Sequence, residues 1–446
     1  MRKLIFVLIL LPALLFAQNI KGIVTYKVNN APIEGVNIFL KQSNTRGLTN
    51  EKGEFKLVMP RKAQETDTLY ISHIGYIAKK VPFAELVKNN FSILLDPEIE
   101  ILNGVTISKG KRQSKIAYTK LTPLKYPISS FGSILKDNKI YLIGGDASFE
   151  SDAFKKLKYT KPDFTINDYI QELKRQTNLK LYKNTLLIYN IETDSWEQSK
   201  IKFKKRAYHN LNYYDNKIYV IGGKNSSVNG KFEYLDNTIE VFDLNKETIT
   251  TDNTNPHQAA DFASISYNDN IIVMGGSIKM SENGTKEYSK KSHSYNISSG
   301  YWYDLPDMLI AKETQGLLIG SKIYLVGGFN KLPLSEIESF DLTTEKWQIE
   351  GVLFYGISKP AIAYNDNMLY ILENEKIFTY NILTKQLKEF LISLPLKASK
   401  IHYSNNKLYL LGGFTENDYS RSPSASVYSI DLDEFEITKP NRSKFL

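Results

Sequence analysis

A pair of adjacent glycines closing a short run of large apolar residues recurs along most of this chain and restricts its fold. The runs are "KIYLIGG", "KIYVIGG", "NIIVMGG", "KIYLVGG" and "KLYLLGG". The pairs are Gly144-Gly145, Gly222-Gly223, Gly275-Gly276, Gly327-Gly328 and Gly412-Gly413. A sixth copy, "NMLYILEN", carries Glu373 and Asn374 at the glycine positions. Successive copies lie 39 to 78 residues apart, which predicts one compact unit of strands per copy.

Glycines that follow a strand can have two different roles, namely phosphate binding or a structural corner. In a phosphate-binding loop the glycines open a helix, as in G-x-x-x-x-G-K-[ST] or G-x-G-x-x-G. Polar loops follow the glycines here instead. The pairs are therefore interpreted as structural corners, where glycine permits positive φ and close approach of another backbone.

A second mark recurs in phase with the glycines. After each pair a run ends in Asn or Asp, and a bulky residue follows six positions later. The pairs of positions are Asn190 and Trp196, Asp243 and Ile249, Asn296 and Trp302, Asp341 and Trp347, Asn381 and Leu387, and Asp431 and Ile437. Between them lies turn chemistry such as "YNIETDSW", in which Asn or Asp bonds nearby backbone.

These marks together resemble the kelch repeat, and the resemblance runs from about residue 128 to residue 441. It implies a six-bladed kelch-type β-propeller. With the small β-sandwich domain that the preceding residues predict, the expected fold is all-β. The basic residue that the repeat places on its innermost strand is clear only in "KKRAYHN". That departure weakens any transfer of binding residues from the family, but it leaves the fold unaffected.

Residues 19–107 have a different sequence pattern. Short runs in which apolar and polar residues alternate, such as "IKGIVTY" and "GEFKLVM", are separated by turn sequences. This is the pattern of a small β-sandwich. Gly22, Gly35, the "TNEKGEF" turn and "IGY" at 74–76 resemble the carboxypeptidase regulatory-like domain. That resemblance implies an accessory domain without catalytic residues, of a kind found in exported proteins of the Bacteroidetes type.

The first seventeen residues have the pattern of a signal peptide, with a basic start, an apolar stretch and Ala17 near a cleavage site. We therefore expect an exported protein, either periplasmic or associated with the cell surface, with no stable membrane span after cleavage. An outer-membrane-associated partner is compatible with that location. Residues 108–127 are basic, contain two prolines and are predicted to be a linker or a strap between the domains.

Composition excludes several classes of partner and cofactor. The net charge is +9, but the lysines are scattered without a basic stripe, so we expect no nucleic acid. Cysteine is absent, which removes disulfides and thiolate metal ligands. The five histidines lack metal-ligand spacing, so neither a metal nor a cofactor is predicted.

In a propeller the loop between the second and third strands and the connection between blades emerge on one face, and binding residues are expected there. The largest insertion, residues 146–182, contains "TINDYIQELKRQ", in which Ile166, Tyr169, Ile170 and Leu173 have helical spacing. The candidate ligand-binding residues near the channel mouth are Arg206, Tyr208, His209, Lys312, Tyr355, Tyr419 and Arg421. Arginine pairs with carboxylates, and tyrosine stacks on sugars or peptides.

No constellation of residues specifies catalysis. We therefore favour a non-catalytic binding or scaffold protein that recognises a protein or a glycan through one loop face. The alternative is a sugar-active enzyme, because the architecture is similar to that of bacterial sialate mutarotases, and mutarotation needs only a positioned acid and base. Copper radical oxidases are excluded, because their cofactor requires a cysteine.

Overall fold

The computed structural model describes residues 18–27, 29–40, 45–59, 63–73, 76–97, 113–175, 179–280 and 286–446. The predicted signal peptide and two residues of the "IGY" motif lie outside this set. The chain divides into two compact units, Met1–Val105 and Thr106–Leu446, and each is described by itself. No described helix has the length and apolar character needed to cross a bilayer.

The first unit is the predicted β-sandwich. One sheet has the order β4 (Glu54–Met59), β1 (Gln18–Tyr26), β7 (Ser92–Leu95). The other has the order β3 (Thr45–Leu48), β2 (Asn37–Leu40), β5 (Thr68–Ser72), β6 (Lys79–Pro82). Alternate residues such as Val24, Ile38 and Leu69 point into one apolar core. A short helix, α1 (Phe83–Lys88), closes it with Phe83 and Leu86.

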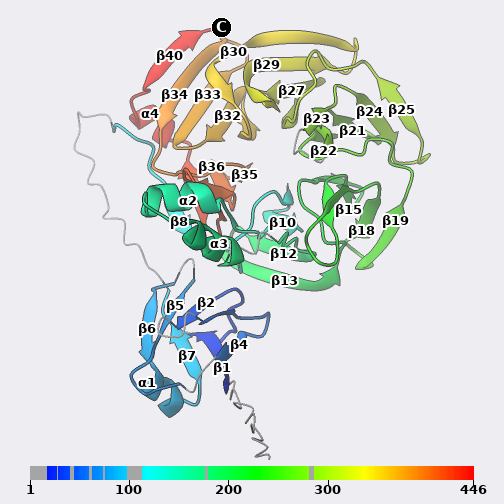
Figure 1. Ribbon diagram of the computed structural model, residues 1–446. Helices are drawn as coiled ribbons and strands as arrows, with labels where there is room; N and C mark the ends of the chain where they lie inside the picture. Colours follow the sequence, from blue (N-terminus) through cyan, green and yellow to red (C-terminus); the bar gives the residue numbers. More distant parts are fainter. Residues whose placement is uncertain are drawn as a thin grey trace, which may run out of the picture. The chain divides into compact units, whose positions relative to one another are not determined.

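The second unit is a ring of six antiparallel sheets around a central axis (Figure 1). Blade one contains β9 (Gly132–Lys136), β10 (Lys139–Ile143), β12 (Thr185–Asn190) and β13 (Ser195–Lys202). Blade two contains β14 (Asn210–Tyr214), β15 (Lys217–Ile221), β18 (Ile239–Asp243) and β19 (Thr248–Asp252). Blade three contains β20 (Ala263–Tyr267), β21 (Asn270–Met274), β24 (Ser292–Asn296) and β25 (Trp302–Leu305).

The remaining three blades follow the same meander. Blade four contains β26 (Gly316–Ile319), β27 (Lys322–Val326), β29 (Leu332–Asp341) and β30 (Lys346–Ile357). Blade five contains β31 (Ala361–Asn365), β32 (Met368–Glu373), β33 (Lys376–Asn381), β34 (Gln386–Leu391) and an added outer strand, β40 (Arg442–Phe445). Blade six contains β35 (Lys400–Ser404), β36 (Lys407–Leu411), β39 (Val427–Asp431) and β8 (Thr119–Leu121).

The glycine pairs are structural corners, as the sequence predicts. Their φ angles lie between 55° and 112°, a region in which side chains other than glycine are strained. The second residue of each pair donates its backbone N–H to a carbonyl of the following blade, at 2.7 to 3.2 Å. The donor and acceptor pairs are Gly145 and Arg206, Gly223 and Ala259, Gly276 and Lys312, Gly328 and Ile357, Asn374 and Leu396, and Gly413 and Ile128. The six hydrogen bonds join every blade to the next, and Asn374 replaces glycine at a φ of 45°.

The second sequence mark forms an aromatic pair on the outer part of three blades. Trp196, Trp302 and Trp347 each lie 4.9 Å, centroid to centroid, from an aromatic ring on the neighbouring strand. The Asn or Asp six residues earlier accepts backbone N–H groups within the turn, as Asn190 does from Glu192 and Thr193. The pattern therefore fixes both the turn and the packing of the outer strand.

The sequence leaves open how the ring closes, and the structure answers this. Ile437 takes the place in the repeat that Trp196, Trp302 and Trp347 occupy on the fourth strand of their blades. Ile437 instead ends a short helix, α4 (Glu434–Ile437). The outer strand of blade six is β8, which precedes blade one in the chain and pairs with β39. The three residues "TKL" of this strand are too few to show a recognisable alternation of apolar and polar side chains.

Most of the segment 108–127, which the sequence predicts to be a linker or a strap, belongs to the second unit as a packed strap. Of these residues, 113–127 pack on the propeller, because Ile116, Leu124 and Tyr126 are buried in its apolar clusters. The carboxyl end also continues past residue 441, since β40 pairs with β34.

The predicted insertion helix exists and has a partner. α3 (Ile166–Arg175) includes the predicted residues, and α2 (Ala153–Thr160) precedes it. Both follow the two-residue strand β11 (Glu150–Ser151), which pairs with β38 (Ser420–Pro423) of blade six. Other blades carry hairpins at the same point, β16 (Lys224–Ser226) with β17 (Glu233–Leu235) and β22 (Ser277–Met280) with β23 (Lys286–Tyr288).

Candidate ligand-binding site in the central channel

A cavity of about 210 Å³ lies on the propeller axis, and all six blades contribute to its wall. Each blade contributes the residue that lies fourteen positions before its first glycine, or before Glu373 in blade five. These residues are Ser130, Tyr208, Asp261, Glu313, Lys359 and Ala398. The wall is therefore a ring of one register position, in which the side chains differ from blade to blade.

The backbone at this position is held in an unusual conformation. Ser130, Tyr208, Asp261 and Ala398 all have positive φ, between 50° and 62°. The N–H of Tyr208 donates to the carbonyl of Ser130 at 2.7 Å, and the N–H of Asp261 donates to the carbonyl of Tyr208 at 3.0 Å. These bonds offset the local strain and fix where the side chains point.

Acidic and basic side chains come together on the wall of this cavity. Lys359 Nζ lies 2.6 Å from Asp261 Oδ2. Burial raises the pKa of the Asp261 carboxyl, but Lys359 and Lys286 outweigh that effect and hold it below its usual range. The ring of Tyr208 lies 5.2 Å from Lys359 Nζ and 5.0 Å from Lys224 Nζ, and its hydroxyl donates to Asp146 Oδ2 at 2.9 Å.

The wall of the same cavity includes a lysine, Lys400, that has no direct ion pair among the described residues. Lys400 Nζ donates to Gln315 Oε1 at 3.1 Å, and no described Asp or Glu comes within ion-pairing distance. Burial lowers the pKa of Lys400 from 10.5 to about 8. The charge of Asp261 opposes this shift in part, and Lys359 adds to it. The channel therefore holds an ammonium group that feels an acidic neighbour but has no direct ion pair among the described residues.

Two histidines complete this part of the wall. His402 Nε2 lies 2.8 Å from Ser133 Oγ, and burial, with Lys400 nearby, lowers its pKa to about 3. His209 Nε2 accepts the backbone N–H of Gly132 at 3.3 Å. Burial, followed by the charge of Arg206, lowers the pKa of His209 well below its usual value. Both rings are neutral at pH 7 and serve as hydrogen-bonding groups.

A second cavity, of about 450 Å³, lies between the insertion of blade one and the hairpin of blade six. It is lined by Tyr419 and Arg421 on one side and by Glu150 and Lys180 on the other. Arg421 stacks over the Phe414 ring at 3.8 Å, and its Nη1 lies 3.9 Å from Glu150 Oε2. Arg421 therefore already has a carboxylate partner within the protein.

The seven predicted residues fall into three groups. Tyr208 and His209 line the central cavity, and Tyr419 and Arg421 line the second one. Arg206, Lys312 and Tyr355 line neither cavity. The Tyr355 hydroxyl donates to Glu389 Oε2 at 2.9 Å, and Lys312 Nζ lies 2.5 Å from Glu338 Oε2 with both side chains fully buried.

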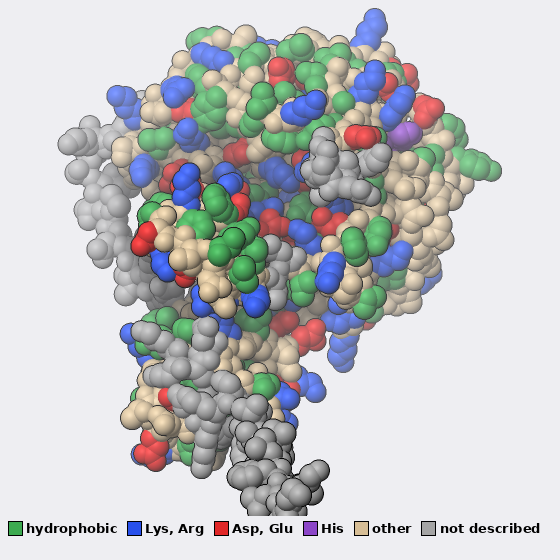
Figure 2. Space-filling model, viewed as in Figure 1, with side chains coloured by type: hydrophobic (Ala, Val, Ile, Leu, Met, Phe, Trp, Pro, Cys, Tyr) green, Lys and Arg blue, Asp and Glu red, His purple; other side chains and the backbone are tan. Residues whose placement is uncertain are grey.

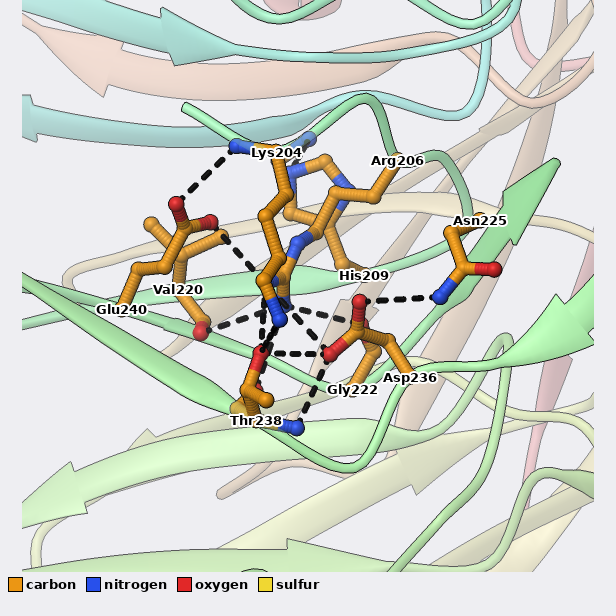
Figure 3. Close-up of polar contacts among 10 residues, drawn as sticks. Lys204, Arg206, His209, Val220, Gly222, Asn225, Asp236, Thr238 and Glu240 are labelled. Carbon is orange, nitrogen blue, oxygen red and sulfur yellow. Dashed lines mark hydrogen bonds and ion pairs between the residues drawn. The ribbon is translucent and has the colours of Figure 1, made fainter. Parts of the chain in front are cut away.

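Arg206 is a structural residue within blade two (Figure 3). Its Nη2 lies 2.9 Å from Glu240 Oε2 and 3.5 Å from Asp236 Oδ1. Its Nη1 donates to the carbonyl oxygens of Val220, Gly222 and Thr238. A guanidinium with this many fixed acceptors joins β15 and β18, the second and third strands of the blade. It has few N–H groups left for a ligand.

Sequence reasoning missed Asp261, Glu313, Lys359, Lys400 and His402, although a signal was present. Counting fourteen positions back from each glycine pair gives Asp261, Glu313 and Lys359 directly. Counting twelve and ten positions back in blade six gives Lys400 and His402. The repeat register could thus have placed them on one wall, because equivalent positions of a radial repeat face the same axis.

The fold and the channel define a kelch-type β-propeller, and comparisons with known proteins agree. The KLHDC2/KLHL20/DRC7 Kelch-repeats domain matches residues 174–372, and the CarboxypepD_reg-like domain matches residues 20–107. The chain therefore contains a kelch-repeat domain and, before it, a CarboxypepD_reg-like domain.

Two individual proteins illustrate how distant its relatives are. An F-box/kelch-repeat protein of Arabidopsis thaliana is 27% identical over 125 residues, which cover 23% of this chain and 30% of that protein. The chain thus spans about a third of the length of this relative. The solved structure of YjhT is similar with a TM-score of 0.50 and 12% identity, over 70% of this chain and 99% of that one. That likeness concerns the fold.

Proposed function

We propose that this protein is an exported, non-catalytic binding protein that holds a glycan or protein ligand on the loop face of its propeller. In this proposal a polar, negatively charged group of the ligand enters the central channel. The loops and hairpins around the mouth contact the rest. The site of action is the periplasm or the cell surface, where an outer-membrane-associated partner is accessible.

One observation carries the proposal: several buried polar atoms on the channel wall have no hydrogen-bond partner. They are Ser130 Oγ, Glu313 Oε2 and Ser399 Oγ, on side chains no more than 9% exposed, and none is paired within the described chain. Buried polar groups in proteins are nearly always paired. Hydroxyl groups of a ligand, or the ordered water that a ligand displaces, would satisfy these atoms.

The charge of the ligand follows from Lys400. An ammonium in a confined cavity whose hydrogen-bond partner is an amide oxygen can still donate a direct hydrogen bond to an added carboxylate. The cavity of about 210 Å³ admits a group of the size of one sugar ring or one acidic side chain. Acidic sugars and acidic peptides share this chemistry.

The test is titration calorimetry with monosaccharide probes, namely N-acetylneuraminic and glucuronic acids against neutral glucose, and with a peptide ending in Asp or Glu. We expect one acidic probe to bind and glucose to fail. The variant Lys400→Met should lower that affinity by tenfold or more, since a hydrogen bond to a charged group contributes about 1.5 to 3 kcal/mol. Lys200→Met, on the exposed outer strand β13, is the matched control. Equal affinity of the two variants would refute the proposal.

A sugar-active enzyme is the second candidate, and the pKa of Lys400, lowered to about 8, is the observation that favours it. An amine with a pKa near neutrality can exchange protons, as general acid–base catalysis requires. If the neutral amine takes the anomeric hydroxyl proton while a proton passes to the ring oxygen, the bond between the anomeric carbon and the ring oxygen breaks, and the open sugar can close to either anomer. NMR exchange rates on N-acetylneuraminic acid decide this candidate: acceleration that Lys400→Met abolishes supports the enzyme, and an unchanged rate supports the binding protein.

A further inference from the structure

The helical insertion of blade one presents an apolar surface to solvent. On α3 the residues Ile166, Ile170 and Leu173 recur at helical spacing and are 79%, 41% and 47% exposed. The residue that α3 buries is instead Glu172, whose Oε1 lies 2.6 Å from Lys156 Nζ on α2. An amphipathic helix of a globular domain ordinarily turns its apolar stripe inward. This helix is held by its polar face, and its apolar stripe is free.

Aromatic residues extend the stripe onto α2. Phe154, 52% exposed, lies edge-on to Phe164 at 5.6 Å and to Tyr169 at 6.2 Å between ring centroids. We call the surface formed by Phe154, Ile166, Tyr169, Ile170 and Leu173 the hairpin surface. Figure 2 shows hydrophobic side chains gathered over α2 and α3.

The hairpin is also positively charged. Residues 153–175 contain six Lys or Arg and three Asp or Glu, which gives a net charge of +3. Two of the three acids are already paired, Glu172 with Lys156 and Asp168 with Lys161. Lys158 and Lys174 are exposed and form no ion pair with any residue that the structure describes.

We propose that the α2–α3 hairpin docks on the surface of a bilayer that contains anionic lipid. An exposed apolar stripe flanked by unpaired cations matches such a surface, because acyl chains accept the stripe while anionic headgroups attract the lysines. A purely apolar protein partner would leave the cations uncompensated. The helices lie in the interface and do not cross it. The inference does not rest on the ligand in the channel, because no residue of the hairpin surface lines the central cavity.

The test is co-sedimentation of the chain from residue 18 onward with large unilamellar vesicles, because the apolar segment before it would bind lipid itself. Vesicles of phosphatidylethanolamine with 30% phosphatidylglycerol are compared with vesicles of phosphatidylcholine. We expect at least tenfold stronger partitioning to the anionic vesicles, and weaker partitioning in 0.5 M salt.

Two variants and their matched controls distinguish binding through the hairpin from non-specific binding of the protein to lipid. Ile166→Ser with Leu173→Ser should lower partitioning tenfold or more, whereas Leu332→Ser with Leu383→Ser, which are 71% and 70% exposed elsewhere on the propeller, should leave it unchanged. Lys158→Ala with Lys174→Ala should remove the preference for anionic lipid, and Lys200→Ala with Lys346→Ala should not.

Three results would overturn the proposal. They are an absence of vesicle binding by the unsubstituted chain, equal binding by the Ile166/Leu173 and Leu332/Leu383 variants, and a change from dimer to monomer caused by the first pair in light scattering. The last result would assign the surface to a second copy of the chain.

Discussion

The backbone N–H of Gly413 donates to the carbonyl oxygen of Ile128 at 3.2 Å, and this bond joins the last blade to the first. The same junction is reinforced at the rim, where β8 from the start of the propeller pairs with β39 of blade six. The ring is thus closed at its axis by a glycine corner and at its edge by a strand from the opposite end of the domain. Closure couples the start and the end of the propeller into one folding unit.

Removing the closing strand should destabilise the propeller. A chain that begins at residue 122 lacks β8 and the buried Ile116, and it leaves β39 with an unpaired edge. We expect its free energy of unfolding to fall by at least ~3 kcal/mol, from the lost apolar burial and ladder bonds. A chain that begins at residue 113 is the control, since both lack the first domain. Urea unfolding followed by tryptophan fluorescence measures the difference; coincident midpoints would contradict the assigned role of β8.

The glycine corners should tolerate no side chain where another backbone segment approaches closely. At Gly223, with φ of 81°, an added Cβ would lie 2.5 Å from the carbonyl oxygen of Ala207. At Gly320, with φ of 61°, nothing lies within 4 Å of that position. Gly320→Ala therefore isolates the backbone strain, about 1 kcal/mol. Gly223→Ala should cost about 3 kcal/mol or more, because backbone must shift as well. Equal losses in thermal and urea unfolding would show that φ alone selects glycine.

The sequence predicted the repeating frame well, because two independent marks recur in phase. The glycine pairs and the tryptophans each report a backbone corner or a packing contact that every blade repeats, so blade number and strand order followed. The β8 strand and the α2 helix were missed. They have three and eight residues, which are too few for a periodic pattern of apolar residues to stand out.

The site was predicted less well, for a physical reason. Arg206 and Lys312 look like ligand-binding cations in the sequence, yet their partners Glu240 and Glu338 lie on another strand of the same blade. Pairing across a sheet is a tertiary property that the local sequence does not display. Lys400 and Gln315 likewise come together from blades six and four across the axis.

Arg206 should behave as a buried ion-pair residue. Replacing it with Met leaves Glu240 and Asp236 buried without their cation, a change that costs about 3 to 5 kcal/mol in proteins. Replacing Arg206 and Glu240 together with Met should restore part of that loss, since one of the uncompensated charges is then also removed. Chemical unfolding of the two variants and of the native chain measures this. A single variant as stable as the native protein would show that the pair contributes nothing net.

Lys400 should lower stability at neutral pH and cease to do so in alkali. Its pKa is about 8 in the folded chain against an ordinary value of 10.5, so the unfolded chain binds more protons between these limits. Stability from this group therefore rises with pH across that window, by up to about 3 kcal/mol. Lys400→Met lacks the penalty, and we expect it to be more stable than the native chain at pH 7. The advantage should shrink as pH rises from 8 towards 10.5.

The difference in unfolding free energy between native and Lys400→Met chains, measured in urea at intervals from pH 7 to pH 10, isolates this residue from other groups that titrate in alkali. Lys200→Met, whose site on β13 is exposed, should give a small difference that is constant with pH. If Lys400→Met were instead less stable at pH 7, the bond to Gln315 would outweigh desolvation, and the prediction would be wrong. If Lys400→Met is more stable than the native chain and also loses binding of the acidic probe, Lys400 is retained for its ligand. Stability alone would favour its replacement.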